Sequence, residues 1–109
     1  MPDVLKLPSF RLDGKVALVT GAGRGLGAAI AAGFAEAGAE VILLGRTRAH
    51  LEEVCRQIGS GGGLSSITAC DVTDDESVRK VIMALPCLDI LVNNAGTNFP
   101  EPFTSVSDE

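Results

Sequence analysis

The sequence predicts an α/β fold in which helices cover both faces of a parallel β-sheet. Short apolar runs alternate along the chain with segments that carry apolar residues at helical spacing. Alternation of strands and helices requires crossover connections, and these produce parallel strands with helices on both faces. The first run, residues 15–20, shows no alternation of polar and apolar residues, as expected for a strand buried on both faces. No internal repeat competes with this interpretation.

The first predicted strand covers residues 15–20 and runs directly into a cluster of glycines. The helix behind the cluster is predicted from Leu26, Ile30 and Phe34, which recur at helical spacing with alanines between them. Gly38 marks the expected end of this helix, because glycine readily adopts the left-handed conformation found at helix C-termini.

The next elements are a strand over residues 40–44 and a helix over about residues 47–58. Residues 59–63, Gly-Ser-Gly-Gly-Gly, are expected to form a flexible loop, and a third strand is predicted over about residues 66–70. The helix places four apolar residues on one face, namely Leu51, Val54, Cys55 and Ile58.

Thr73 and Glu76 form a capping-box pattern, which predicts a third helix with Thr73 as its N-cap. Pro86 ends this helix, a fourth strand is predicted over residues 89–93, and residues 94–109 are expected to form a loop. The apolar face of the third helix consists of Val78, Val81, Ile82 and Leu85.

Length and composition indicate one globular domain. The chain has 109 residues, of which 46% are hydrophobic and 21% charged, so disorder is not expected over most of its length. We expect residues 1–13 to form an N-terminal arm and residues 14–109 to form the domain. Nine basic and fourteen acidic side chains give a net charge of −5 without a basic stripe, which argues against nucleic acid as a partner.

Neither a targeting signal nor a metal-ligand spacing appears in the sequence. The N-terminus lacks the apolar core of a signal peptide, and no apolar run approaches the length of a membrane span. These features predict a cytoplasmic protein that has no membrane partner. Cys55, Cys70 and Cys87 lie far apart and His50 stands alone, so no metal site is predicted and the cysteines are expected to be reduced thiols.

The glycine cluster, Thr20-Gly-Ala-Gly-Arg-Gly-Leu-Gly27, lies between a predicted strand and a predicted helix. A glycine after a strand permits a sharp turn, and glycines near the helix let a pyrophosphate approach the N–H groups of the helix N-terminus. A P-loop is excluded, because Ala28 and Ala29 follow Gly27 where Lys and Ser or Thr are needed. The context favours a dinucleotide-binding turn over a plain flexible loop. The sequence therefore predicts a Rossmann-type doubly wound parallel sheet, of which this chain holds the first four strands in the order 3-2-1-4.

Arg46, at the end of the second predicted strand, discriminates among nucleotide cofactors. NAD sites usually have an acid here to bind ribose hydroxyls, as do methyltransferases, whose sheets also open with a glycine-rich turn. An arginine instead suits a 2′-phosphate through bidentate charge-assisted hydrogen bonds, and Arg24 in the turn supplies a second positive charge. We therefore predict NADP(H) in preference to NAD(H). The alternative is that both arginines are solvated surface residues.

Three motifs follow three of the predicted strands: Thr20-Gly-x-x-x-Gly-x-Gly27, Asp71-Val72 and Asn93-Asn-Ala-Gly96. Together they resemble the motifs of the short-chain dehydrogenase/reductase family, and the resemblance extends from about Leu12 to the end of the chain. Arg24 occupies the position at which the epimerase branch has a glycine, so the pattern resembles the dehydrogenase and reductase branch.

The resemblance implies a role for each matching position. Gly21, Gly25 and Gly27 would border the pyrophosphate, with the backbone of Leu26 nearby. The complete predicted cofactor-binding set is Gly21, Arg24, Gly25, Leu26, Gly27, Arg46, Asp71, Val72, Asn93, Ala95 and Gly96.

The remaining members of this set lie after the third and fourth predicted strands. By the resemblance, Asp71 and Val72 would lie against the adenine, with the Asp71 carboxylate accepting a hydrogen bond from its amino group. Asn93, Ala95 and Gly96 would line the adenosine ribose and the path to the nicotinamide.

The residues that carry out the family's chemistry, a Tyr, a Lys, a Ser and an Asn, have no counterparts in this chain. It contains no Tyr, its lysines (Lys6, Lys15 and Lys80) lack a Tyr-x-x-x-Lys context, and Ser105 and Ser107 lie in the wrong segment. No catalytic residue is therefore predicted here, and we expect the 109 residues alone to be marginally stable and inactive. The resemblance implies the N-terminal part of an NAD(P)(H)-dependent oxidoreductase that acts on a small alcohol or ketone and forms a homo-oligomer at full length. The alternative is a stand-alone dinucleotide-binding or regulatory module without catalysis.

Overall fold

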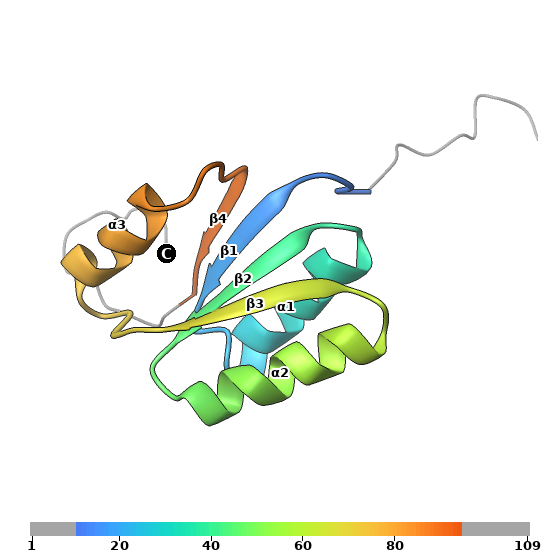
Figure 1. Ribbon diagram of the computed structural model, residues 1–109. Coiled ribbons are helices and arrows are strands. Elements are labelled where there is room, and N and C mark those ends of the chain that lie inside the picture. The colour runs from blue at the N-terminus through green and yellow to red at the C-terminus, as the bar shows by residue number, and fades with distance from the viewer. Residues whose placement is uncertain (1–10, 95–109) are drawn as a thin grey trace, which may run out of the picture.

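The computed structural model describes residues 11–94, and over this range strands and helices alternate as predicted (Figure 1). The elements are β1 (Val16–Thr20), α1 (Gly25–Glu36), β2 (Glu40–Gly45), α2 (Arg48–Ser60), β3 (Leu64–Ala69), α3 (Asp75–Met83) and β4 (Ile90–Asn93). No helix in residues 11–94 combines the length and the apolar content needed to cross a membrane.

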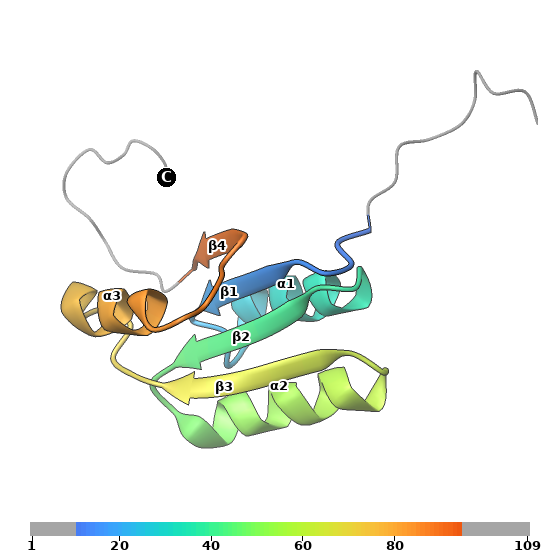
Figure 2. The same ribbon diagram turned by 45° about the horizontal axis from the view of Figure 1, so that its top comes forward.

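The strands form one parallel sheet in the order β3-β2-β1-β4, which confirms the predicted topology. β1 lies inside the sheet, so that Ala17 is paired with Val41 of β2 on one side and with Ile90 of β4 on the other. The arrowheads in Figure 2 all point to the same edge of the sheet. The segments that follow the strands are therefore brought together at this carboxyl edge, where open α/β sheets bind their ligands.

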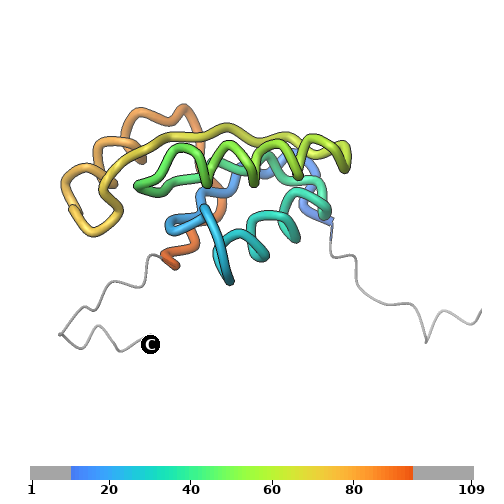
Figure 3. Tube along the Cα trace, turned by 90° about the horizontal axis from the view of Figure 1, so that it is seen from below, coloured from blue at the N-terminus to red at the C-terminus, as the bar shows by residue number. Residues whose placement is uncertain are grey.

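Helices pack against both faces of the sheet. Figure 3 shows α1 and α2 next to each other, and they pack over the face that carries Val19 and Leu43. The opposite face carries Leu18 and Leu44, which contact apolar side chains of α3 such as Val78. Because β1 and β2 contact helices on both faces, residues 16–19 and 41–44 form uninterrupted apolar runs.

The buried face of α1 differs in part from the prediction. Its buried residues are Gly27, Ala31 and Ala35. Ile30 and Phe34 are partly buried and pack against the core as predicted, whereas Leu26 is 67% exposed. At Gly27 the helix lies too close to the glycine turn for any side chain, and Ala31 and Ala35 continue the same buried face.

The N-cap of α3 is Asp74, and the prediction of Thr73 was wrong. The Asp74 carboxylate accepts hydrogen bonds from the N–H of Glu76 (3.1 Å) and from the hydroxyl of Ser77 (2.9 Å). The Thr73 hydroxyl donates instead to the carboxylate of Asp71 at 2.6 Å. A carboxylate is a stronger acceptor for orphan N–H groups than a hydroxyl, so Asp74 takes the cap.

α2 is longer and β3 begins earlier than predicted. Two residues assigned to the loop, Gly59 and Ser60, belong to the last turn of α2, and the N–H of Gly61 closes the helix by donating to the carbonyl of Gln57. A glycine in a helix costs about 1 kcal/mol relative to alanine, and the buried apolar face of α2 offsets this cost. β3 starts at Leu64, which is paired with the first residue of β2.

Candidate cofactor-binding site

The turn between β1 and α1 has a backbone conformation that favours glycine. Gly21 directly follows β1 and Gly25 opens α1, and each has a φ of 63°. A side chain at either position would strain the backbone. α1 then begins without a side-chain cap and without an acid in its first turn. Its N–H groups and the positive end of its dipole are thus directed to the carboxyl edge of the sheet, an arrangement that favours an anion.

Gly27 lies where α1, the turn and the segment after β4 meet. A Cβ atom at Gly27 would overlap the carbonyl oxygen of Gly21 and would lie 2.6 Å from Nδ2 of Asn94. The helix is therefore packed directly against the backbone of the turn. This packing fixes the distance between the helix N-terminus and the end of β1.

Thr20 connects the end of β1 to the end of β4, and it is only 2% exposed. Its hydroxyl accepts a hydrogen bond from the N–H of Asn94 at 2.8 Å and donates to Oδ1 of Asn93 at 3.1 Å. The sheet register already pairs Thr20 with Asn93. The hydroxyl thus orients both asparagines at the edge of the site.

The Thr20→Val substitution is expected to destabilise the protein by about 1–3 kcal/mol, because it leaves the Asn94 N–H without its acceptor while preserving the side-chain shape. Amide hydrogen exchange at Asn94 measures the local effect and should become faster in Thr20→Val. In the control Thr20→Ser, which keeps the hydroxyl, this exchange should stay slow even though a methyl group is lost. Unchanged exchange in the valine variant would contradict the role given to the hydroxyl.

A cavity of about 610 Å³ opens at the carboxyl edge, between the glycine turn and the start of α2. Its lining consists of Gly21, Gly23, Arg24, Gly45, Arg46, Thr47, His50, Leu51, Val72 and Asn94. Four members of the predicted set are among them, contributed by the segments after β1, β2 and β3. The carboxyl edge therefore brings Gly21, Arg24, Arg46 and Val72 together around one space.

Other members of the predicted set lie around the cavity without lining it. Gly25 and Gly27 shape the turn, and Asn93 is held by Thr20. Leu26 projects into solvent, and Asp71 immediately precedes the lining residue Val72. Ala95 and Gly96 lie outside the described residues, so their predicted roles stay predictions.

Asp71 is held in its ionised form. The pKa of its carboxyl group is lowered, first by the hydrogen bond from the Thr73 hydroxyl (2.6 Å) and then by that from the Thr73 N–H (3.0 Å). Partial desolvation opposes this shift, and the positive charge of Arg46 lowers the pKa further. The ends of β2 and β3 thus place an arginine and a carboxylate within electrostatic range of each other.

Sequence reasoning missed the remaining lining residues: Gly23, Gly45, Thr47, His50, Leu51 and Asn94. Thr47 is the N-cap of α2 and His50 lies in the first turn of this helix. The position of these two residues near the site could have been inferred from the topology, because a helix that follows β2 must begin at the carboxyl edge. The glycine turn approaches the start of α2 at Gly23, where an added Cβ atom would lie 2.9 Å from Cβ of His50.

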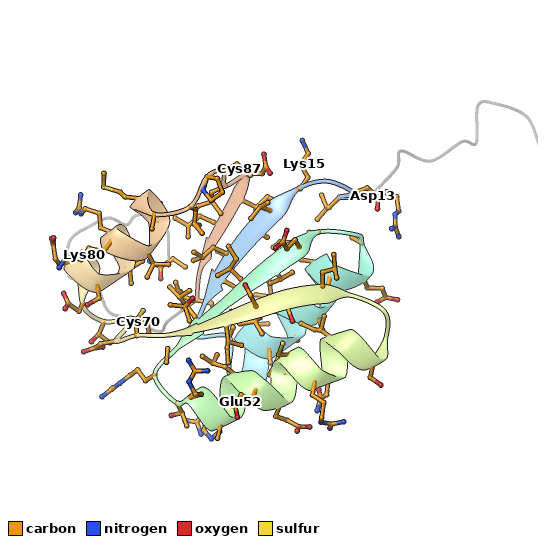
Figure 4. The ribbon with its side chains drawn as sticks, viewed as in Figure 1. Asp13, Lys15, Glu52, Cys70, Lys80 and Cys87 are labelled. Carbon is orange, nitrogen blue, oxygen red and sulfur yellow. The ribbon has the colours of Figure 1, made fainter. Side chains whose placement is uncertain are left out.

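The cysteines offer no site of their own. Figure 4 shows Cys70 at the carboxyl end of β3 and Cys87 near Lys15 at the opposite end of the sheet. All three cysteines are free. Burial raises the pKa of the Cys70 thiol, and the charges of Asp71 and Asp74 raise it further, so this thiol is a poor nucleophile. Within residues 11–94, no group of His, Cys, Asp and Glu side chains is arranged to hold a metal ion.

A parallel sheet in the order 3-2-1-4, a glycine turn leading into an uncapped helix, and a cavity at the carboxyl edge define a Rossmann-type α/β protein. The chain belongs to the short-chain dehydrogenase family, whose sequence model matches residues 15–109. The resemblance inferred from the three motifs is thereby confirmed.

Individual relatives agree with this assignment. An uncharacterised oxidoreductase of Mycobacterium tuberculosis is 44% identical over 105 residues, which cover 93% of this chain and 40% of the relative. The 7alpha-hydroxysteroid dehydrogenase of Escherichia coli K12 is 40% identical over 99 residues, covering 87% of this chain and 39% of that enzyme. The chain therefore spans about 40% of the length of these curated relatives.

The fold is also similar to that of solved structures. A 3-oxoacyl (acyl-carrier-protein) reductase from Agrobacterium tumefaciens, with NADP bound, superposes with a TM-score of 0.70 at 41% identity, over 84% of this chain and 36% of that one. A metagenomic short-chain oxidoreductase in complex with NADP gives a TM-score of 0.71 at 41% identity, over 81% of this chain and 42% of that one.

Proposed function

We propose that this chain forms the cofactor-binding part of an NAD(P)(H)-dependent oxidoreductase that acts on alcohol or carbonyl groups and prefers NADP(H). The observation that carries the proposal is that Arg46, at the end of β2, lines the same cavity as Gly21 and Arg24 of the glycine turn. One cavity thus offers a turn that accommodates a pyrophosphate and two cations that suit a further phosphate.

The residues present fit a dinucleotide. No side chain caps α1 and its first turn contains no acid, so the helix N-terminus is open to a pyrophosphate, while the close packing at Gly27 fixes its position. The ionised Asp71 is a hydrogen-bond acceptor suited to an adenine amino group. We assign the binding role to the predicted set, with Gly25 and Gly27 shaping the turn and Asn93 bordering the ribose.

A bound nicotinamide dinucleotide supplies hydride-transfer chemistry. This chain's residues would bind and orient it: the turn and α1 hold the pyrophosphate, and Arg24 and Arg46 neutralise the 2′-phosphate. The full-length protein is expected to take a small alcohol or ketone as substrate and to form a homo-oligomer. The three free cysteines support a reducing compartment such as the cytoplasm.

Equilibrium titration of the full-length protein with NADPH and NADH tests the cofactor preference. We expect NADPH to bind at least about tenfold more tightly, because a hydrogen bond to a charged group contributes roughly 1.5–3 kcal/mol. Tenfold tighter binding of NADH would overturn the argument from Arg46. Absence of binding by both would overturn the proposed function.

A further inference from the structure

His50 lines the cavity and has no role in the proposed function. It lies in the first turn of α2, and its side chain is exposed. The contact between its Cβ and the position that a Cβ of Gly23 would occupy (2.9 Å) shows that the base of the His50 side chain lies against the glycine turn. His50 is therefore part of the cavity wall that contains Arg24 and Arg46.

No acidic side chain lines this wall, and the Asp71 carboxylate, which interacts with Arg46, lies beside the cavity without lining it. The ionisable residues that line the cavity are Arg24, Arg46 and His50, and all three are basic. Thr47 adds a hydroxyl that does not cap α2, and the first turn of the helix contains no acid. Arg48 lies in the same turn but does not line the cavity; it pairs with Glu52 at 3.8 Å. This wall thus suits a dianionic group better than a neutral ribose.

His50 differs from the arginines in the chemistry that it offers. An imidazole presents an N–H donor whether it is neutral or protonated, so it contacts a phosphate oxygen in either state. It also projects from a helix, while Arg46 follows a strand end and Arg24 lies in the glycine turn. Donors from three different segments enclose a tetrahedral phosphate more completely than donors from one.

We propose that His50 is a specificity-determining residue that donates a hydrogen bond to the 2′-phosphate of NADP(H), assisted by the Thr47 hydroxyl. This inference rests on the proposed function and extends it to the first turn of α2. NAD(H), which lacks the phosphate, gains nothing from His50. Removal of the imidazole should therefore weaken the binding of one cofactor and leave the other unchanged.

The experiment measures the dissociation constants of NADP⁺ and NAD⁺ by calorimetric titration of the full-length protein. His50→Leu preserves the size of the side chain and removes the donor, and His50→Asn restores an N–H donor. We expect His50→Leu to raise the Kd of NADP⁺ about tenfold and to change that of NAD⁺ less than about twofold. His50→Asn should recover part of the loss. The matched control is Arg48→Gln, which removes a positive charge from the same helix turn outside the cavity.

Competition with 2′,5′-ADP and 5′-AMP separates the possible outcomes, because these probes differ only in the 2′-phosphate. Wild-type protein that does not distinguish them would overturn the proposed NADP(H) preference and the role of His50 together. Discrimination that is as strong in His50→Leu as in the wild-type protein would overturn the His50 inference alone. The inference would also be overturned if His50→Leu weakened the binding of both probes equally, because that result indicates a structural role. It would likewise be overturned if Arg48→Gln had the same effect as His50→Leu, because that result indicates a long-range effect of charge.

Discussion

Replacement of Gly27 by alanine is expected to destabilise the domain by about 3 kcal/mol and to weaken dinucleotide binding at least about a hundredfold. The added Cβ would overlap the carbonyl oxygen of Gly21 and would meet Nδ2 of Asn94 at 2.6 Å. The first of these contacts is with backbone, so no side-chain rotation relieves it. The start of α1 must move away from the turn, and its N–H groups then lose their position at the carboxyl edge.

The matched control is Gly33→Ala in the same helix. Nothing lies within 4 Å of a Cβ at Gly33, so this substitution should stabilise the protein by up to about 1 kcal/mol through helix propensity. Thermal unfolding and cofactor titration of both variants measure the contrast. Gly27→Ala protein with wild-type stability and affinity would show that α1 does not lie against the turn as described.

The strands β1 and β2 were predicted well because their sequences carry direct evidence of burial, which the more exposed β3 and β4 lack. β1 and β2 are apolar on both faces, and only a strand covered by helices on both sides tolerates such a run in water. The strand order followed from the glycine turn and the alternating elements. The buried stripe of α1 was not predicted completely, because hydrophobic spacing favours large side chains such as Leu26, while the close approach at Gly27 selects small ones.

The site was predictable where a residue lies next to a strand end, and less so within helices. Arg46 follows β2 directly and Val72 lies in the segment just after β3, so their position at the carboxyl edge could be inferred from topology alone. His50 and Leu51 line the cavity because of the direction in which α2 leaves β2, and no local pattern encodes this direction. The N-cap of α3 was not predicted because two neighbouring residues, Thr73 and Asp74, can both cap a helix, and the carboxylate of Asp74 is the stronger acceptor.

The substitution Arg46→Asp is expected to reverse the cofactor preference of the full-length protein. Removal of the guanidinium costs a charge-assisted interaction with the 2′-phosphate, and the new carboxylate repels that phosphate. The same carboxylate can accept hydrogen bonds from the ribose hydroxyls of NAD(H), as acids at this position do in NAD sites. The ratio of the two dissociation constants should therefore shift by about 100- to 1,000-fold towards NAD(H).

Arg46→Asp also has an expected effect in the absence of any cofactor. Because the charge of Arg46 lowers the pKa of Asp71, its replacement by a carboxylate should raise that pKa, which an NMR titration of the Asp71 side chain measures. The control Arg48→Asp makes the same charge change at a residue that does not line the cavity. The ratio of the two dissociation constants and the pKa of Asp71 should therefore both change less than in Arg46→Asp. If both variants shift the ratio equally, discrimination arises from the overall positive charge near the start of α2. If only Arg46→Asp shifts it, the side chain at the end of β2 contacts the 2′-phosphate itself.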